Sequence, residues 1–226
     1  MPNLPEKTVN AINNQKAVDL FNKLADSYQE RFFSVEAYKE PLLLFLEELK
    51  DHATVLDVAC GPGNISHFLL EQKPGLNLTG IDLAPNMIEL ARINNPDAIF
   101  KVHNALEIDQ LNSHFDAIVI GFLFPYFSVE QVEDFLEKVY SILNPGGTIY
   151  LSTMEDLYEN SRLRASSTGE QVMMHYYEAG FLVSLLERIG FEVISERTQP
   201  YRISETETDT DLIIVAKKTP ENQLSR

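Results

Sequence analysis

The sequence is poor in the residues that build disulfide, metal and membrane sites. Cys60 is the single cysteine, so an internal disulfide is excluded and a reducing compartment is favoured. The five histidines show no metal-ligand spacing, and we expect no metal. No apolar run approaches the ~18 residues of a membrane span, and the segment 1–15 lacks the apolar centre of a signal peptide. We therefore expect a cytoplasmic protein without a membrane segment.

Basic residues are also scarce. The chain of 226 residues has 18 Lys and Arg against 34 Asp and Glu, a formal net charge of −16. Binding to nucleic acid depends on clustered Lys and Arg, so nucleic acid is not an expected partner, and neither is an anionic membrane surface. The hydrophobic content of 44% is ordinary for a globular protein and is enough to bury a core of good size.

Apolar strand segments alternate with helical segments through most of the chain. Several of these strands are apolar throughout, which is typical of a parallel sheet covered on both faces. No helix separates the last two strands, so they should pair as an antiparallel hairpin at one edge. We expect a doubly wound α/β fold with a mostly parallel seven-stranded sheet, an antiparallel final strand and helices on both faces. The strand segments are 54–58, 76–81, 98–102, 115–120, 148–153, 191–197 and 211–217.

A glycine turn follows the first strand. Gly61 and Gly63 would let a ligand approach the backbone, and the helix that follows offers unpaired N–H groups. A dinucleotide site needs a third glycine, but Ser66 stands at that position. Asp57 at the end of the strand would repel a pyrophosphate and suits a ligand that carries an ammonium group. This favours S-adenosylmethionine (SAM) over a nicotinamide dinucleotide.

Asp82 ends the second strand. Its two carboxylate oxygens can accept hydrogen bonds from both hydroxyls of a ribose. The spacing from Gly61 to Asp82 is close to the ~20 residues expected for this role. Either feature alone could be a plain turn or a helix cap, but their order and strand–turn–helix context together indicate a nucleoside site.

The sequence resembles the class I SAM-dependent methyltransferases, which have a Rossmann-like fold, over nearly its whole length. The similar motifs are 57–63, 80–87, 115–121 and 143–147, and Asn104 stands where the family usually has Asp. The resemblance implies that the first motif holds the methionine part of SAM, Asp82 the ribose, and the following side chains the adenine. It also implies an entry helix whose Tyr28 reaches over the methionine portion. The implied cofactor-binding residues are Tyr28, Asp57, Ala59, Gly61, Asp82, Leu83, Met87, Asn104, Ala105, Leu106 and Gly121.

Two segments are candidates for the acceptor side. The aromatic run 122–127 follows the fourth strand, where ligands of open α/β sheets bind, and cannot all face inward. Tyr126 is our candidate there, with core packing as the alternative. Glu155 follows the fifth strand and could be a general base or an amine-binding carboxylate; its alternative is a solvated loop carboxylate. These two are the candidate catalytic residues.

The resemblance implies one domain over 1–226. Its parts are an N-terminal helical cap (1–50), a SAM-binding core (51–153), an acceptor-side loop or lid (154–177), and a last helix with the closing hairpin (178–218). The polar segment 154–174 has little periodicity and is expected to be irregular.

The favoured function is a methyltransferase that moves the methyl group of SAM to a small-molecule acceptor by in-line displacement. Three alternatives stay open. The chain could methylate a protein, it could be a non-catalytic regulatory module that binds SAM or a nucleoside, or it could be a nicotinamide-dependent oxidoreductase. The missing third glycine and Asp57 disfavour the last of these.

Overall fold

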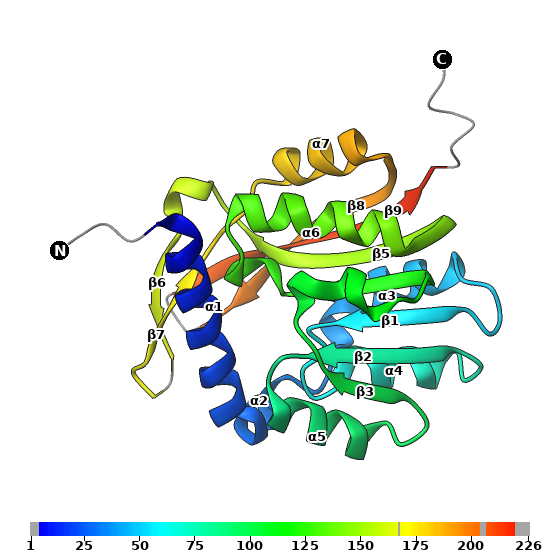
Figure 1. The fold of residues 1–226 in the computed structure, drawn as a ribbon, viewed down its shortest axis with the longest axis horizontal. Helices are drawn as coiled ribbons and strands as arrows, with labels where there is room; N and C mark the ends of the chain where they lie inside the picture. The colour runs from blue at the N-terminus through cyan, green and yellow to red at the C-terminus, as the bar shows by residue number, and fades with distance from the viewer. Residues whose placement is uncertain (1–4, 167, 204–206, 220–226) are drawn as a thin grey trace.

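A seven-stranded sheet forms the centre of the computed structural model, which describes residues 5–166, 168–203 and 207–219 (Figure 1). The strand order is β3-β2-β1-β4-β5-β9-β8, with β1 to β5 parallel and β9 antiparallel to both of its neighbours. This confirms the predicted fold class. The strands are β1 (Thr54–Val58), β2 (Asn77–Asp82), β3 (Ile99–Val102), β4 (Phe115–Gly121), β5 (Leu143–Glu155), β8 (Phe191–Arg202) and β9 (Thr208–Lys218).

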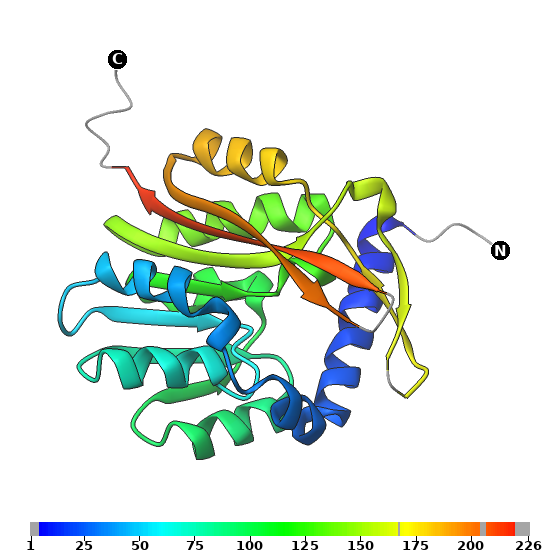
Figure 2. The same ribbon diagram turned by 180° about the vertical axis from the view of Figure 1, so that it is seen from behind.

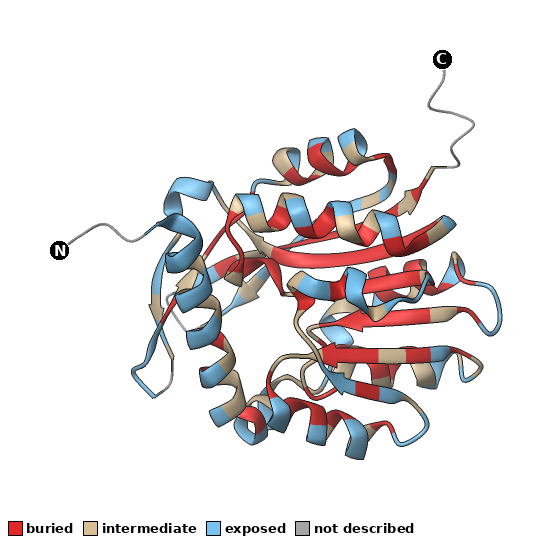
Figure 3. Ribbon diagram, in the orientation of Figure 1, coloured by how far each residue is buried: buried red, intermediate tan, exposed pale blue. Residues whose placement is uncertain are grey.

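Helices cover both faces of the sheet, as Figures 1 and 2 show from opposite sides. One apolar cluster joins the sheet to α3 (Lys39–Glu47), α4 (Asn64–Gln72) and α5 (Pro85–Asn94). A second cluster joins the other face to the 3₁₀ segment η2 (Ala105–Leu111), α6 (Val129–Ile142) and α7 (Ala179–Ile189). Buried residues accordingly follow the central strands and the inward sides of the helices (Figure 3). None of the helices in the described residues is long and apolar enough to cross a bilayer.

Two N-terminal helices lie beside the carboxyl ends of the parallel strands (Figure 1). They are α1 (Glu6–Lys23) and α2 (Ala25–Phe32), where the apolar spacing predicts one helix from 16 to 33. The helix begins earlier than expected, and Leu24 interrupts it with φ −99° and ψ 13°. The α1 helix is tied to the start of α5, because the backbone N–H of Asn86 donates to Asn22 Oδ1 at 2.9 Å.

A two-stranded hairpin, β6 (Arg162–Ala165) and β7 (Gln171–Met174), occupies the segment expected to be irregular. It lies alongside α1, with Val172 packed against Ala17 and Leu20 (Figure 1). The hairpin therefore packs against α1, the helix that covers the site described next.

Candidate active site

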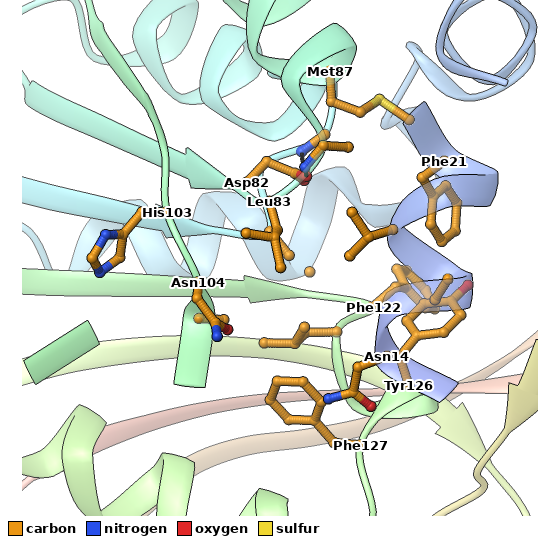
Figure 4. A pocket seen from close by; sticks show the side chains of 18 of the residues that line it. Asn14, Phe21, Asp82, Leu83, Met87, His103, Asn104, Phe122, Tyr126 and Phe127 are labelled. Carbon is orange, nitrogen blue, oxygen red and sulfur yellow. Dashed lines mark hydrogen bonds between the residues drawn. The ribbon is translucent and has the colours of Figure 1, made fainter. Parts of the chain in front are cut away.

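One cavity opens at the carboxyl ends of β1, β2 and β4 and is covered by α1 (Figure 4). The empty space at this place is about 910 Å³, a volume that includes adjoining open solvent. Its position is the one that open α/β sheets use for ligands. The lining residues are Asn14, Ala17, Val18, Phe21, Tyr28, Ala59, Gly61, Asp82, Leu83, Ala84, Met87, His103, Asn104, Ala105, Gly121, Phe122, Leu123, Tyr126 and Phe127.

The turn after β1 forms the floor of this cavity. Gly63 is the N-cap of α4 and has a φ of +76°, a left-handed conformation that glycine adopts without a Cβ clash. A Cβ at Gly63 would lie 2.5 Å from Asn95 Nδ2 and 3.3 Å from Ala91 Cα. The Asn95 amide also donates to the Gly63 carbonyl at 3.0 Å. The turn is therefore held tightly against α5, with the N-terminus of α4 beside the cavity.

Asp82 lines the cavity at the end of β2. Its Oδ2 accepts a hydrogen bond from the Gly61 N–H at 3.0 Å, and its Oδ1 accepts one from the Ala84 N–H at 2.8 Å. Burial raises the pKa of this carboxyl, and the backbone hydrogen bonds oppose that rise. Each oxygen keeps a second acceptor site, so the carboxylate is held in one orientation and can still accept from a ligand.

Asp57 does not line this cavity, although the sequence makes it a candidate ligand. It is 1% exposed, and its Oδ2 accepts a hydrogen bond from Ser66 Oγ at 2.6 Å. Burial raises the pKa of Asp57 to about 7, against an ordinary 3.8. In this structure its carboxylate lies beneath the turn and joins β1 to α4, so any contact with an ammonium group would require the turn to move.

Replacing Asp57 with asparagine is expected to stabilise the folded protein above neutral pH. The native carboxyl holds its proton up to about pH 7 while the unfolded one loses it near 3.8, so the wild-type unfolding free energy falls as pH rises between these values. The advantage of Asp57→Asn in urea unfolding should therefore grow from pH 4 to 7 and level off above. Asp116→Asn is the matched control: hydrogen bonds from Thr54 and Asn144 lower the pKa of Asp116 below 3.8, so the effect of this substitution should not change between pH 4 and 7. A pH-independent difference for Asp57→Asn would contradict the assignment.

The side of the cavity formed by the ends of β2 and β3 carries the polar lining residues Asp82, His103 and Asn104 beside apolar ones. Leu83, Met87, Asn104 and Ala105 all line it, as the resemblance implies for the adenine end. Asn104 caps η2, because its Oδ1 accepts from the Leu106 N–H at 3.0 Å. The remaining predicted residue, Leu106, is half-buried against the core and does not line the cavity.

Aromatic side chains form the opposite side, where α1 faces the 3₁₀ turn η3 (Phe124–Tyr126) (Figure 4). The Phe21 ring packs edge-on against Tyr126 at 5.3 Å and against Tyr28 at 5.6 Å between ring centroids. Burial raises the pKa of Tyr28 to about 12 and that of Tyr126 further, so both phenols are neutral. Of the aromatic run, Phe122, Tyr126 and Phe127 line the cavity, whereas Phe124 and Pro125 are buried in the core.

Glu155 lies outside this cavity. It lines a separate polar cavity beside the start of α7, together with Asp156, Glu178 and Asp209. The structure therefore does not bring the two candidate catalytic residues together: Tyr126 is in the first cavity and Glu155 in the second.

Four lining residues on α1 were not among the predicted site residues. They are Asn14, Ala17, Val18 and Phe21, and their spacings of three, four and seven residues from Asn14 place them on one helical face. The residues that precede Lys16 are mostly polar, so the helical periodicity is weak there. The spacing of the four residues could still have identified the side of α1 that faces the cavity.

The comparison with protein families decides the assignment of the chain. A family model described as "Methyltransferase domain" matches residues 28–196. The chain belongs to this methyltransferase family. The predicted resemblance to class I SAM-dependent methyltransferases is confirmed, and the two alternatives of a non-catalytic regulatory module and a methyltransferase acting on a protein are not favoured.

Curated relatives include two O-methyltransferases. The chain is 28% identical over 146 residues to the malonyl-[acyl-carrier protein] O-methyltransferase of Salmonella typhimurium, covering 63% of this chain and 55% of that protein. It is 29% identical over 163 residues to the ubiquinone biosynthesis O-methyltransferase of Hydrogenovibrio crunogenus, covering 68% and 66% respectively. The chain thus matches under two thirds of the length of either relative.

Solved structures agree on the fold. The 1,6-didemethyltoxoflavin-N1-methyltransferase of Burkholderia thailandensis superposes with a TM-score of 0.70 at 20% identity, covering 97% of this chain and 92% of that one. The seven-stranded architecture is therefore that of a methyltransferase along almost the whole chain.

Proposed function

We propose that this methyltransferase-family protein binds SAM in the cavity at the strand ends and transfers its methyl group to a small molecule. The observation that carries the proposal is the Asp82 carboxylate, which the Gly61 and Ala84 N–H groups hold at the end of β2. A carboxylate fixed in this way matches the vicinal hydroxyls of a ribose. Gly61, whose N–H is one of the two donors, belongs to the turn that lets a ligand approach the backbone.

The remaining lining residues fit the other parts of the same ligand. Leu83 and Met87 would flank the adenine, and Ala105 would lie beside it. The backbone from Ala59 to Gly63 and the Tyr28 ring would enclose the methionine part. Bound SAM supplies an activated methyl group on a sulfonium. The chain's own contribution is to hold an acceptor in line with that group and to exclude water.

The acceptor is proposed to be a small molecule or a small group attached to a carrier. The cavity is covered by α1 and walled by aromatic rings, which suits a compact apolar ligand better than an exposed protein loop. The named relatives support this class, since one methylates in ubiquinone biosynthesis and another acts on malonyl-[acyl-carrier protein].

Calorimetry with SAM, its demethylated product and NAD tests the donor. We expect binding of SAM and of the product, and no binding of NAD. Incubation with methyl-labelled SAM and a metabolite extract, followed by chromatography, tests transfer and separates an enzyme from a regulatory module. Binding of NAD in place of SAM, or SAM binding without any labelled metabolite, would argue against the proposal.

A further inference from the structure

The side chains at the end of the cavity between α1 and η3 indicate the chemistry of the acceptor. This inference rests on the proposed function. Asp82 and Asn104 lie at the opposite end, where β2 and β3 finish, and would be occupied by the nucleoside (Figure 4). The space left for an acceptor is therefore walled by α1, by the end of β4 and by the turn that follows it. Its apolar walls are Ala17, Val18, Phe21, Phe122, Leu123 and Phe127.

Asn14, one of the few polar side chains at this end, is already satisfied by the protein. With its amide oriented to suit its neighbours, the nitrogen donates to the Asn10 and Tyr126 carbonyls at 2.8 and 2.9 Å. Its oxygen accepts from Gln131 Nε2 at 2.8 Å. Asn14 is thus a structural link between α1 and α6, and has little capacity left for an acceptor.

The Tyr126 hydroxyl differs in this respect. Within the described residues neither it nor the Tyr28 hydroxyl forms a hydrogen bond to another residue, and both rings line the cavity. A phenol whose pKa is raised by burial remains a hydrogen-bond donor over the whole physiological pH range. It is therefore suited to donate to an oxygen of the acceptor, and unsuited to remove a proton from it.

No carboxylate, imidazole or amine lines the α1–η3 end among the described residues. Asp82 and His103 lie at the nucleoside end, and His103 Nε2 is 3.0 Å from the Glu107 carbonyl oxygen. Arg164, whose charge acts on Tyr126, is paired with Asp209 and donates to the Tyr176 hydroxyl. An acceptor bound here meets no side chain that could serve as its general base.

Two further carboxyls whose pKa is raised by burial lie outside the cavity. Asp211 accepts from the Tyr38 hydroxyl at 2.7 Å, and the Tyr38 ring packs against Phe122 at 5.5 Å, so Phe122 separates this pair from the cavity. Asp57 is beneath the β1 turn and is bonded to Ser66. Burial raises the pKa of Asp211 to about 6 and that of Asp57 to about 7, so a base function of either would appear as a fixed transition in that range.

We infer that the acceptor is an apolar acid, aromatic or with an extended apolar chain, that binds as its oxyanion with the reacting oxygen hydrogen-bonded to Tyr126. A lone pair of that oxygen forms the new bond to the methyl carbon, the carbon–sulfur bond breaks, and its electron pair stays on sulfur. No proton is transferred, and the negative and positive charges disappear together. Because charge is lost in this step, an apolar site that excludes water favours the transition state over the separated ions.

A series of acceptors with graded acidity tests the inference. We would use phenols of one ring size carrying nitro, cyano or methyl substituents, an aryl carboxylate of similar shape, and the corresponding aryl amine. The pH midpoint of kcat/KM should move with the pKa of each phenol. For the carboxylate, kcat/KM should show no midpoint above the pKa of the carboxylic acid. The amine should react least. A midpoint fixed near 6 to 7 for every acceptor would overturn the inference and indicate a protein base.

A binding measurement separates this inference from the proposed function. Nitrophenol is titrated into protein loaded with a SAM analogue that keeps a positive charge in place of the sulfonium but has no methyl group to transfer, and the phenolate absorbance band is followed against pH. We expect the phenolate to bind, with an affinity about 10- to 100-fold weaker in Tyr126→Phe because a hydrogen bond to an anion is lost. Tyr158→Phe, on the exposed 3₁₀ turn η4 (Tyr158–Asn160), is the matched control and should bind as wild type.

The two hypotheses fail in different ways. If SAM binds but no acid in the series is bound or methylated, the acceptor class is wrong while the SAM site stands. If SAM itself does not bind, the proposed function fails first. Equal phenolate affinity in Tyr126→Phe and in the wild type would remove Tyr126 from the acceptor site.

Discussion

Asp82→Ala is expected to weaken SAM binding by about a hundredfold or more. The substitution removes a carboxylate that would accept from both ribose hydroxyls, and hydrogen bonds to a charged group contribute about 1.5–3 kcal/mol each. Since 1.4 kcal/mol is a factor of ten, the loss of two such bonds accounts for the expected change. Isothermal titration with SAM measures it directly.

The control for Asp82→Ala must separate ribose recognition from damage to the β1 turn, because Asp82 also holds the Gly61 and Ala84 N–H groups. Glu89→Ala removes an exposed carboxylate from α5, the helix that follows β2, and should bind SAM as wild type. Asp82→Asn keeps one acceptor oxygen and should bind with intermediate affinity. Unchanged SAM affinity in Asp82→Ala, with the thermal transition also unchanged, would show that Asp82 is not a ligand.

Gly63→Ala is expected to lower the melting temperature by about 5–10 °C. The left-handed conformation alone costs roughly 1–2 kcal/mol for an L-residue, and the new methyl group would have to displace the Asn95 amide that it would otherwise approach to 2.5 Å. For a chain of this size, each kcal/mol corresponds to roughly 2–4 °C. Differential scanning calorimetry of both proteins without ligand measures the difference.

Gly146→Ala is the matched control for this experiment. Gly146 has a φ of +74°, close to the +76° of Gly63, but a Cβ there would meet nothing within 4 Å. Its melting temperature should therefore fall by about 2–8 °C, the cost of the backbone conformation alone, and by less than that of Gly63→Ala. Equal losses in the two variants would mean that the Asn95 contact adds nothing to the rigidity of the turn.

The sheet and the nucleoside end of the site were predictable from the sequence because they depend on local patterns. Buried parallel strands are apolar throughout, so the segments around Val55 and Ile118 stand out from their neighbours. Asp82 and Gly61 come together because both follow strands that are adjacent and parallel, so their carboxyl ends meet at one edge. In this class of fold, ligands bind at the carboxyl ends of the parallel strands, so the strand order identifies the ligand-binding edge.

The acceptor end was predictable only in part, because it is assembled from distant segments. Whether Phe122 faces the cavity while Phe124 faces the core depends on the left-handed φ of +50° at Phe122, which no pattern in the sequence signals. The β6–β7 hairpin was missed because its strands have only four residues each and Val172 is the single buried residue in them, so they carry little alternation. The sequence does not show that Glu155 lines another cavity than Tyr126 for a similar reason: the direction in which β5 continues past the sheet edge is set by its pairing with β9.

The position of β9 has a consequence for how the chain acquires its structure during synthesis. The strand nearest the end of the described chain does not add to the sheet at its edge; it lies between β5 and β8 and buries Ile213, Ile214 and Val215 almost completely. Until residues 208–218 have left the ribosome, β8 has no partner in the sheet and β5 has an uncovered side. A nascent chain from which β9 has not yet emerged would expose the unpaired edges of β5 and β8. Such apolar strand edges are prone to aggregate. Emergence of β9, rather than emergence of the segments around Gly61 and Asp82, should therefore be the step at which the sheet completes its fold.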